Sequence, residues 1–207
     1  MIKNIIFDIG SVIAYFDEDK LLKTYSDDVL VQEFLRENVI NSPEWVKYGL
    51  IDLGYITLEE MGEAICDRTN HIHDDLVMDL STNHARFIDV QDKVLDLIDK
   101  LRNKGYKVYI LSNTNAVAMK RHDEKNLTNR VDGHVYSYEV NMVKPYIGIY
   151  KELLNKYNLN LDECIFLDDR KENVDTSCNL GIHGEKVIPN SYDSLIDSLK
   201  KYNIEID

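Results

Sequence analysis

The segment that decides the fold is Asn4-Ile5-Ile6-Phe7-Asp8-Ile9-Gly10-Ser11-Val12-Ile13. Its apolar run, residues 5–7, is typical of a buried strand in a parallel sheet. The strand is expected to end at Asp8, where the chain turns. In open α/β sheets this carboxyl edge is where ligands bind. Asp8 is therefore either a turn residue or part of a site, and the rest of the sequence has to distinguish the two.

Composition limits the class of protein and its partners. The chain has 207 residues, 44% of them hydrophobic and 29% charged, which is typical of a globular protein. This length is enough for one core, or for a core plus a small second domain. The formal net charge of -13 argues against nucleic acid or an anionic membrane as a partner. A small anionic substrate would need a local positive site to offset this overall charge.

Targeting signals and cysteines favour a cytoplasmic protein. The strand pattern begins within the first four residues, so we expect no signal peptide, and no apolar run has the length of a membrane span. Cys66, Cys164 and Cys178 are widely spaced and form no CxxC pair, which is typical of reduced thiols. The sequence does not distinguish a monomer from a homodimer.

Residues 15–87 have a helical pattern with no convincing strand. Asp17 or Asp19 is suited to cap a first helix, and Pro43 is suited to the first turn of another. Thr57 and Glu60 have the spacing of a capping box. We therefore predict an all-helical insertion directly after the first strand.

From residue 88 onward, strand patterns alternate with helical ones. Strands are predicted at residues 106–111, 134–138, 164–167 and 185–188, and Lys144-Pro145 is predicted to open a helix. The predicted fold is α/β, with a Rossmann-like parallel sheet flanked by helices. Residues 1–14 and 88–207 would form this core, and residues 15–87 a separate helical domain.

Three predicted strands end in polar residues, which are Asp8, Ser112-Asn113-Thr114 and Asp168-Asp169, and Lys144 lies just after a fourth. Because parallel strands point the same way, these ends should meet at one edge of the sheet. Carboxylates that lie so close repel each other unless a cation lies between them. A hard divalent ion suits these oxygen ligands, and Mg²⁺ keeps positions open for water and phosphate.

The same edge could support covalent chemistry. A carboxylate at a strand end can act as a nucleophile and form an acyl phosphate. The Lys144 ammonium and the Ser112 hydroxyl are then suited to hold phosphoryl oxygens.

The order of these motifs resembles the haloacid dehalogenase superfamily of phosphohydrolases. The resemblance covers nearly the whole chain and rests on four motifs, which are Phe7-Asp8-Ile9-Gly10-Ser11-Val12, Leu111-Ser112-Asn113-Thr114-Asn115, Lys144-Pro145 with Tyr150, and Phe166-Leu167-Asp168-Asp169 with Asn173. The helical insertion resembles the helical cap domain of that family. Within it, the branch of sugar-phosphate phosphatases, such as the glucose-1-phosphate phosphatases, is the most similar.

The resemblance implies a Mg²⁺-dependent phosphatase that hydrolyses a small phosphorylated metabolite through an aspartyl-phosphate on Asp8. It implies that Asp8 is both nucleophile and metal ligand, and that the Gly10 carbonyl and Asp169 complete the protein ligands. It further implies that Asp168 and Asn173 support the site, and that Ser112 and the Asn113 amide bind phosphate. Lys144 would neutralise charge on Asp8 and the phosphoryl group.

Gly10 departs from the family pattern. Most phosphatases of the superfamily carry an aspartate two residues after the nucleophile, as general acid and base. Losing such a group lowers a rate by roughly 10²–10⁴-fold. Anomeric sugar, acyl and aryl phosphates would be affected least. Two alternatives stay open: hydrolysis of a carbon–halogen bond, against which the Asp168-Asp169 pair counts, and a catalytically weakened phosphate-binding protein.

Two further groups have both a functional and a structural interpretation. Trp45, Tyr48 and Tyr55 could line a sugar pocket or pack between the two domains. The run Lys120-Arg121-His122 is expected to be a solvent-exposed charged face, although it could also contact substrate anions.

Overall fold

The computed structural model describes residues 1–47 and 49–206. The strands are β1 (Asn4–Phe7), β2 (Ala14–Phe16), β3 (Ile88–Val90), β4 (Lys107–Ser112), β5 (Gly133–Tyr136), β6 (Cys164–Asp168) and β7 (His183–Lys186). The α-helices are α1 (Glu18–Tyr25), α2 (Val29–Leu35), α3 (Leu58–Arg68), α4 (Asp74–Asn83), α5 (Asp92–Asn103), α6 (Ala116–His122), α7 (Ser137–Val140), α8 (Ile147–Tyr157), α9 (Lys171–Leu180) and α10 (Tyr192–Lys201). Short 3₁₀ or π-helical turns are η1 (Arg36–Ile40), η2 (Pro43–Lys47), η3 (His84–Phe87), η4 (Asp123–Lys125), η5 (Thr128–Arg130) and η6 (Leu161–Glu163).

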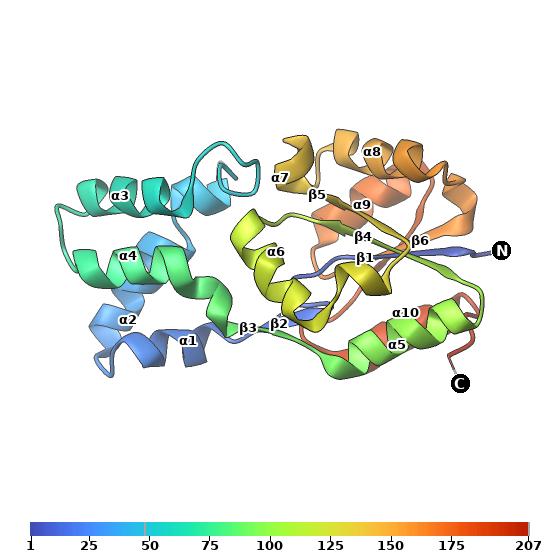
Figure 1. The fold of residues 1–207 in the computed structure, drawn as a ribbon, viewed down its shortest axis with the longest axis horizontal. Helices are drawn as coiled ribbons and strands as arrows, with labels where there is room; N and C mark the ends of the chain where they lie inside the picture. Colours follow the sequence, from blue (N-terminus) through green and yellow to red (C-terminus); the bar gives the residue numbers. More distant parts are fainter. Residues whose placement is uncertain (48, 207) are drawn as a thin grey trace.

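The core is a parallel sheet with the strand order β5-β4-β1-β6-β7 (Figure 1). Strand β1 lies at its centre, because its apolar residues are buried on both faces. Phe7 pairs with Ile110 of β4 on one side and Leu167 of β6 on the other. The predicted α/β fold with a parallel sheet is therefore confirmed, and Asp8 follows its central strand.

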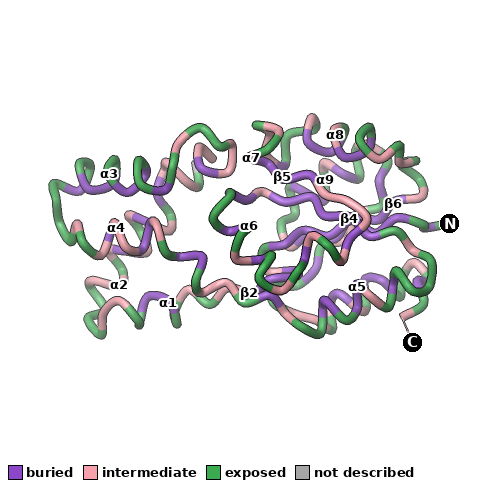
Figure 2. Tube along the Cα trace, in the orientation of Figure 1, coloured by how far each residue is buried: buried purple, intermediate pink, exposed green. Residues whose placement is uncertain are grey.

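The two faces of the sheet have different helical layers. Ile5 and Phe7 of β1 belong to an apolar cluster that includes α5 and α10, whereas Ile6 belongs to a second cluster that includes α8. This division follows from the alternation of side chains along a strand. In Figure 1, α5 and α10 lie below the sheet and α8 above it, and Figure 2 shows the buried strands between these layers.

Helices α1 to α4 form an insertion between β2 and β3, on the left of Figure 1. The insertion has its own apolar cluster, centred on fully buried side chains such as Leu21, Leu35, Met61 and Ile65. Residues 15 and 16 were predicted to belong to the helical segment, but they lie in β2. Strand β2 pairs antiparallel with β3, and this two-stranded ribbon carries both crossings between the insertion and the core.

Several predicted boundaries are wrong. Helix α8 begins at Ile147, after Lys144 and Pro145, which lie in a loop. Strand β5 ends at Tyr136, and the next residues form α7. The last strand begins at His183, two residues before the predicted start, because α9 ends at Gly181 in the left-handed conformation and only one residue follows before the strand.

The helices of the described residues were compared with the length and hydropathy that a membrane span requires. Among the described residues, no helix is both long and apolar enough to cross a bilayer. Cys66 and Cys164 are buried and Cys178 is exposed, and all three are free thiols.

Helix α3 begins with a complete capping box, and we expect Thr57→Ala to lower the free energy of unfolding by about 1 kcal/mol. The Thr57 hydroxyl accepts from the Glu60 N–H at 3.1 Å, and the Glu60 carboxylate accepts from the Thr57 N–H at 2.7 Å. Urea denaturation measures the change, with exposed Glu63→Gln on the same helix as the control. Equal midpoints for the two variants would contradict the prediction.

Candidate active site

Lys144 joins the ends of two strands through its ammonium group. Its Nζ lies 2.7 Å from Asp8 Oδ1, just beyond β1, and 2.7 Å from Asp168 Oδ2, at the end of β6. The Lys144 side chain is only 1% exposed. A buried cation between two carboxylates is a costly arrangement unless its hydrogen bonds are satisfied, and here both partners lie at hydrogen-bonding distance.

The Lys144 backbone is held by the side chain of Asn113. Asn113 Nδ2 donates to the Lys144 carbonyl at 3.0 Å, and Asn113 Oδ1 accepts from the Lys144 N–H at 2.7 Å. This pair of bonds connects the loop after β4 to the loop before α8. These two bonds fix the orientation of the Asn113 side chain, and its backbone N–H is left for a ligand.

Asp168 is saturated with hydrogen bonds. Its oxygens accept from Asn173 Nδ2 at 3.0 Å and from the Arg170 N–H at 2.8 Å, in addition to Lys144. Asn173 is positioned in turn, because its carbonyl accepts from the Tyr150 hydroxyl at 2.9 Å. Asp168 and Asn173 therefore form a rigid support at the end of β6.

Asp8, Asp168 and Asp169 each offer an oxygen within 4.8 Å of the others. Burial raises the pKa of Asp8 to about 6, opposed by Lys144 and assisted by the neighbouring aspartates. Burial and the Asp168 charge also raise the pKa of Asp169. One ammonium against three carboxylates leaves an excess of negative charge, which favours a bound cation.

These residues fit a divalent metal ion. Among the described residues, no other residue donates a hydrogen bond to the Asp169 carboxylate, and Asp8 uses one oxygen for Lys144. Oxygen donors that are free, close together and partly desolvated are what Mg²⁺ requires. Asp168 has no such freedom, because its oxygens are already occupied.

A cavity of about 250 Å³ opens over this cluster and is called the acidic cavity below. From the core it is lined by Asp8, Gly10, Asn113, Lys144 and Asp169, with Ser11, Arg170 and Asn173 beside them. Asp52 lines it from the helical insertion. Seven of the eight predicted site residues therefore lie together here or directly support it.

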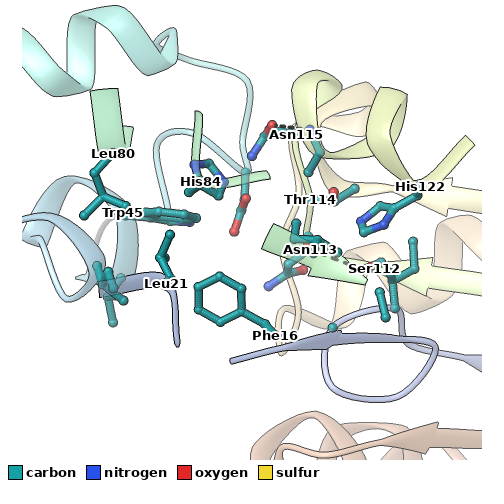
Figure 3. Close-up of a pocket in the computed structure, with 18 residues that line it drawn as sticks. Phe16, Leu21, Trp45, Leu80, His84, Ser112, Asn113, Thr114, Asn115 and His122 are labelled. Atoms are coloured by element: carbon teal, nitrogen blue, oxygen red, sulfur yellow. Dashed lines mark hydrogen bonds between the residues drawn. The ribbon is translucent and has the colours of Figure 1, made fainter. Parts of the chain in front are cut away.

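A second cavity of about 250 Å³, called the apolar cavity, lies between the insertion and the core (Figure 3). Its lining includes Phe16, Leu21, Trp45 and Leu80 on one side and residues 112–115 with His122 on the other. The eighth predicted residue, Ser112, lines this cavity and is almost completely buried.

The prediction that His122 belongs to an exposed charged face is wrong. His122 is 4% exposed, and burial lowers its pKa to about 4. Ala118, Met119 and His122 share the buried face of α6, and this helical spacing is the sequence signal that could have placed His122. Its Nδ1 has no hydrogen-bond partner among the described residues.

The predicted aromatic residues of the insertion differ in whether they line the apolar cavity. Trp45 lines the apolar cavity, and its ring centroid lies 4.5 Å from that of His84. His84 also lines the cavity, and burial lowers its pKa. Tyr55 is exposed and lies outside this lining, and Tyr48 lies outside the described residues.

The sequence-based interpretation did not identify Asp52. Burial raises its pKa to about 6, with Lys144 and Arg170 opposing the shift. No local motif distinguishes this aspartate from the many others in the chain. Only the docking of the insertion on the core brings it to the acidic cavity.

The chain is similar to several known proteins over most of its length. D-ribitol-5-phosphate phosphatase from Bacteroides thetaiotaomicron is 27% identical over 197 residues, which cover 87% of this chain and 89% of that protein. The magnesium complex of a haloacid dehalogenase-family enzyme from the same organism is 25% identical, with a TM-score of 0.73, and covers 95% of this chain and 98% of that one.

A third relative has the same fold at lower identity. L-2-haloacid dehalogenase from Xanthobacter autotrophicus is 17% identical, with a TM-score of 0.65, and covers 99% of this chain and 85% of that one. The family model of the haloacid dehalogenase-like hydrolases matches residues 2–176, which is most of the chain. This protein therefore belongs to the haloacid dehalogenase-like hydrolase family.

Proposed function

We propose that this hydrolase is a Mg²⁺-dependent phosphatase, which transfers the phosphoryl group of a small metabolite to Asp8 and then to water. The observation that carries the proposal is the buried Lys144 ammonium, 2.7 Å from both Asp8 and Asp168, inside a cluster of three carboxylates. A cation beside an anionic nucleophile allows it to approach an anionic phosphate. The 27% identity to a D-ribitol-5-phosphate phosphatase supports the same reaction.

The metal ion would be held by the Asp8 and Asp169 carboxylates and the Gly10 carbonyl. Asp168 would act through its hydrogen bonds to Asn173 and Lys144 rather than as a ligand. When bound, Mg²⁺ would neutralise charge on the phosphoryl oxygens and fix their orientation. The magnesium complex of the 25% identical structure supports this choice of ion.

The phosphoryl group would be held in the acidic cavity by Lys144 and the backbone N–H of Asn113, and from the adjoining apolar cavity by the Ser112 hydroxyl. One carboxylate oxygen of Asp8 would then attack phosphorus in line with the leaving oxygen. Donors fixed before the reaction stabilise the transition state more than donors that must reorganise. Asn113 contributes to this rigidity, because its side chain holds the Lys144 backbone.

We also propose the division into a core, residues 1–14 and 88–207, and a helical cap, residues 15–87. The separate apolar cluster of the insertion supports it, although the boundary falls inside the β2–β3 ribbon. The cap would cover the active site and supply the apolar cavity for the organic part of the substrate. Cytoplasmic location and the choice between monomer and homodimer stay predictions.

The substrate class follows from both cavities together. A sugar phosphate would place its phosphate in the acidic cavity and one face of its carbon skeleton against Trp45. The predominantly apolar walls of the apolar cavity favour substrates with an apolar or planar face over fully hydrated polyols. Neither a carbon–halogen hydrolase nor a weakened phosphate-binding protein gains specific support from the site geometry.

Removal of Mg²⁺ tests the proposal. With p-nitrophenyl phosphate, we expect turnover in MgCl₂, loss of turnover in excess EDTA, and recovery when Mg²⁺ is restored. Mg²⁺ should also raise the melting temperature of the wild-type protein, because binding to the folded state stabilises it. Asp169→Asn should abolish that rise, and Asp162→Asn, at the opposite end of β6, should retain it.

Three outcomes would favour other functions. Phosphatase turnover that survives EDTA would contradict the metal requirement. Release of chloride from a 2-haloacid without Mg²⁺ would support the carbon–halogen alternative. Binding of Mg²⁺ and a phosphate mimic, without turnover of any ester in a broad panel, would support the phosphate-binding alternative.

A further inference from the structure

Departure of a poor leaving group requires a proton donor beside the leaving oxygen, and position 10 provides none. Gly10 lies beside Asp8 in the acidic cavity but carries no titratable group. The leaving oxygen of a substrate has to lie between the phosphoryl group and the organic part. The residues that line both the acidic and the apolar cavity therefore surround its position, and in the described chain these are Gly10, Asn113 and Asp52.

Of these three residues, only Asp52 can exchange a proton. Asn113 uses its side-chain amide for two hydrogen bonds to the Lys144 backbone. The Asp52 carboxylate accepts no hydrogen bond from any described residue. We propose that Asp52, supplied by the helical insertion, is the general acid and base of this active site. The inference rests on the phosphatase function proposed above.

The loop that carries Asp52 is fixed on both sides. Ile51 is 2% exposed and packs in the apolar cluster of the insertion. The Leu53 carbonyl accepts a 2.7 Å hydrogen bond from Asn141 Nδ2, which belongs to the core. Asp52 thus lies between an anchor in the insertion and an anchor in the core.

Gly54 allows the loop to approach the core closely. Its φ is +71°, a conformation that side chains disfavour, and an added Cβ would lie 3.1 Å from the Tyr138 carbonyl oxygen. The glycine therefore serves the close docking of this loop against α7. Close docking is what brings Asp52 over the acidic cavity.

The charges around Asp52 are compatible with both protonation states. Lys144 and Arg170 favour the carboxylate, whereas burial favours the acid and raises the pKa to about 6. Asp8 and Asp169 line the same acidic cavity, and His84 and His122 line the apolar cavity. A group that titrates near neutrality can both donate and accept a proton during turnover.

Asp52 gives up a proton in the first chemical step and regains one in the second. In the first, an Asp8 oxygen forms a bond to phosphorus, the bond from phosphorus to the leaving oxygen breaks, and that oxygen takes the proton of Asp52. In the second, Asp52 takes a proton from water, the water oxygen bonds to phosphorus, and the bond to Asp8 breaks. Inorganic phosphate leaves, and Asp52 is protonated again.

The test is Asp52→Asn in the full chain with Mg²⁺, using esters of different leaving groups. Steady-state hydrolysis of an alkyl phosphate should fall by roughly 10²–10⁴-fold. With p-nitrophenyl phosphate, whose leaving group needs no proton, the variant should release a burst of about one p-nitrophenol per active site before slow turnover, because hydrolysis of phospho-Asp8 lacks its general base. Asp67→Asn, an exposed aspartate of the insertion, should behave as wild type. Asp52→Ala should repeat the pattern, with melting curves to verify folding.

Two results would overturn the role of Asp52. One is alkyl phosphate turnover within twofold of wild type. The other is absence of the burst in a folded variant, which would indicate a structural role. Failure of the proposed phosphatase function is distinguishable, because the wild-type protein itself would then show no turnover.

Discussion

Asp8→Asn should abolish phosphatase turnover, lowering kcat by roughly 10⁴-fold or more, as loss of a nucleophile does in other covalent enzymes. Asparagine retains the shape of the side chain, but its neutral amide is too weak a nucleophile to attack phosphorus. The stability should change little or increase, because the substitution removes one of three mutually repelling carboxylates. Turnover of p-nitrophenyl phosphate and thermal melting measure the two effects.

A chemically matched control separates the nucleophile from general charge effects. Asp96→Asn makes the same change at an exposed position of α5, far from the acidic cavity, and should leave kcat unaltered. Acid-quenched wild-type enzyme should carry covalent phosphate that the Asp8→Asn variant lacks. A variant that still forms the covalent adduct would place the nucleophile elsewhere.

Lys144→Met should lower the free energy of unfolding by about 3–5 kcal/mol and also abolish turnover. Methionine occupies a similar volume, but it leaves Asp168, which is fully buried, and Asp8 without their cation. An unpaired buried charge is the main reason for such losses. Because a typical domain is stable by only about 5–15 kcal/mol, urea denaturation should show the change clearly.

Lys171→Met is the control for Lys144→Met. Its side chain is 72% exposed and pairs with Asp175 at the surface, so its loss should change stability by about 0–1 kcal/mol. Mg²⁺ should recover more stability in Lys144→Met than in wild type, since it supplies positive charge to the same carboxylates. Equal urea midpoints for the two lysine variants would contradict the assigned importance of the buried contact.

The strand ends were predictable because they depend on local patterns. The apolar runs before Asp8 and before Asp168 identify two buried strands, and parallel order brings their ends together. The motif predicted that Lys144 belongs to the site, but it did not predict which residues hold the Lys144 backbone in place. It lies in a loop held by Asn113 rather than at the start of α8, and no local signal reveals a hydrogen bond between residues 31 positions apart.

The contribution of the insertion to the site was not predictable from local patterns. Strands β2 and β3 have three residues each and pair across the whole insertion, so neither has a clear periodicity. The position of Asp52 depends on the contact between Leu53 and Asn141, which are 88 residues apart. Such placement is decided by the docking of two separately packed parts.

The β2–β3 ribbon described above has a kinetic consequence. Because β2 and β3 pair with each other, we expect the two crossings between the insertion and the core to move together rather than independently. Any opening that admits a substrate would separate Leu53 from Asn141 and withdraw Asp52 at the same moment. Substrate entry and readiness for proton transfer would then be successive phases of a single motion, and that motion would set the upper limit on the catalytic rate.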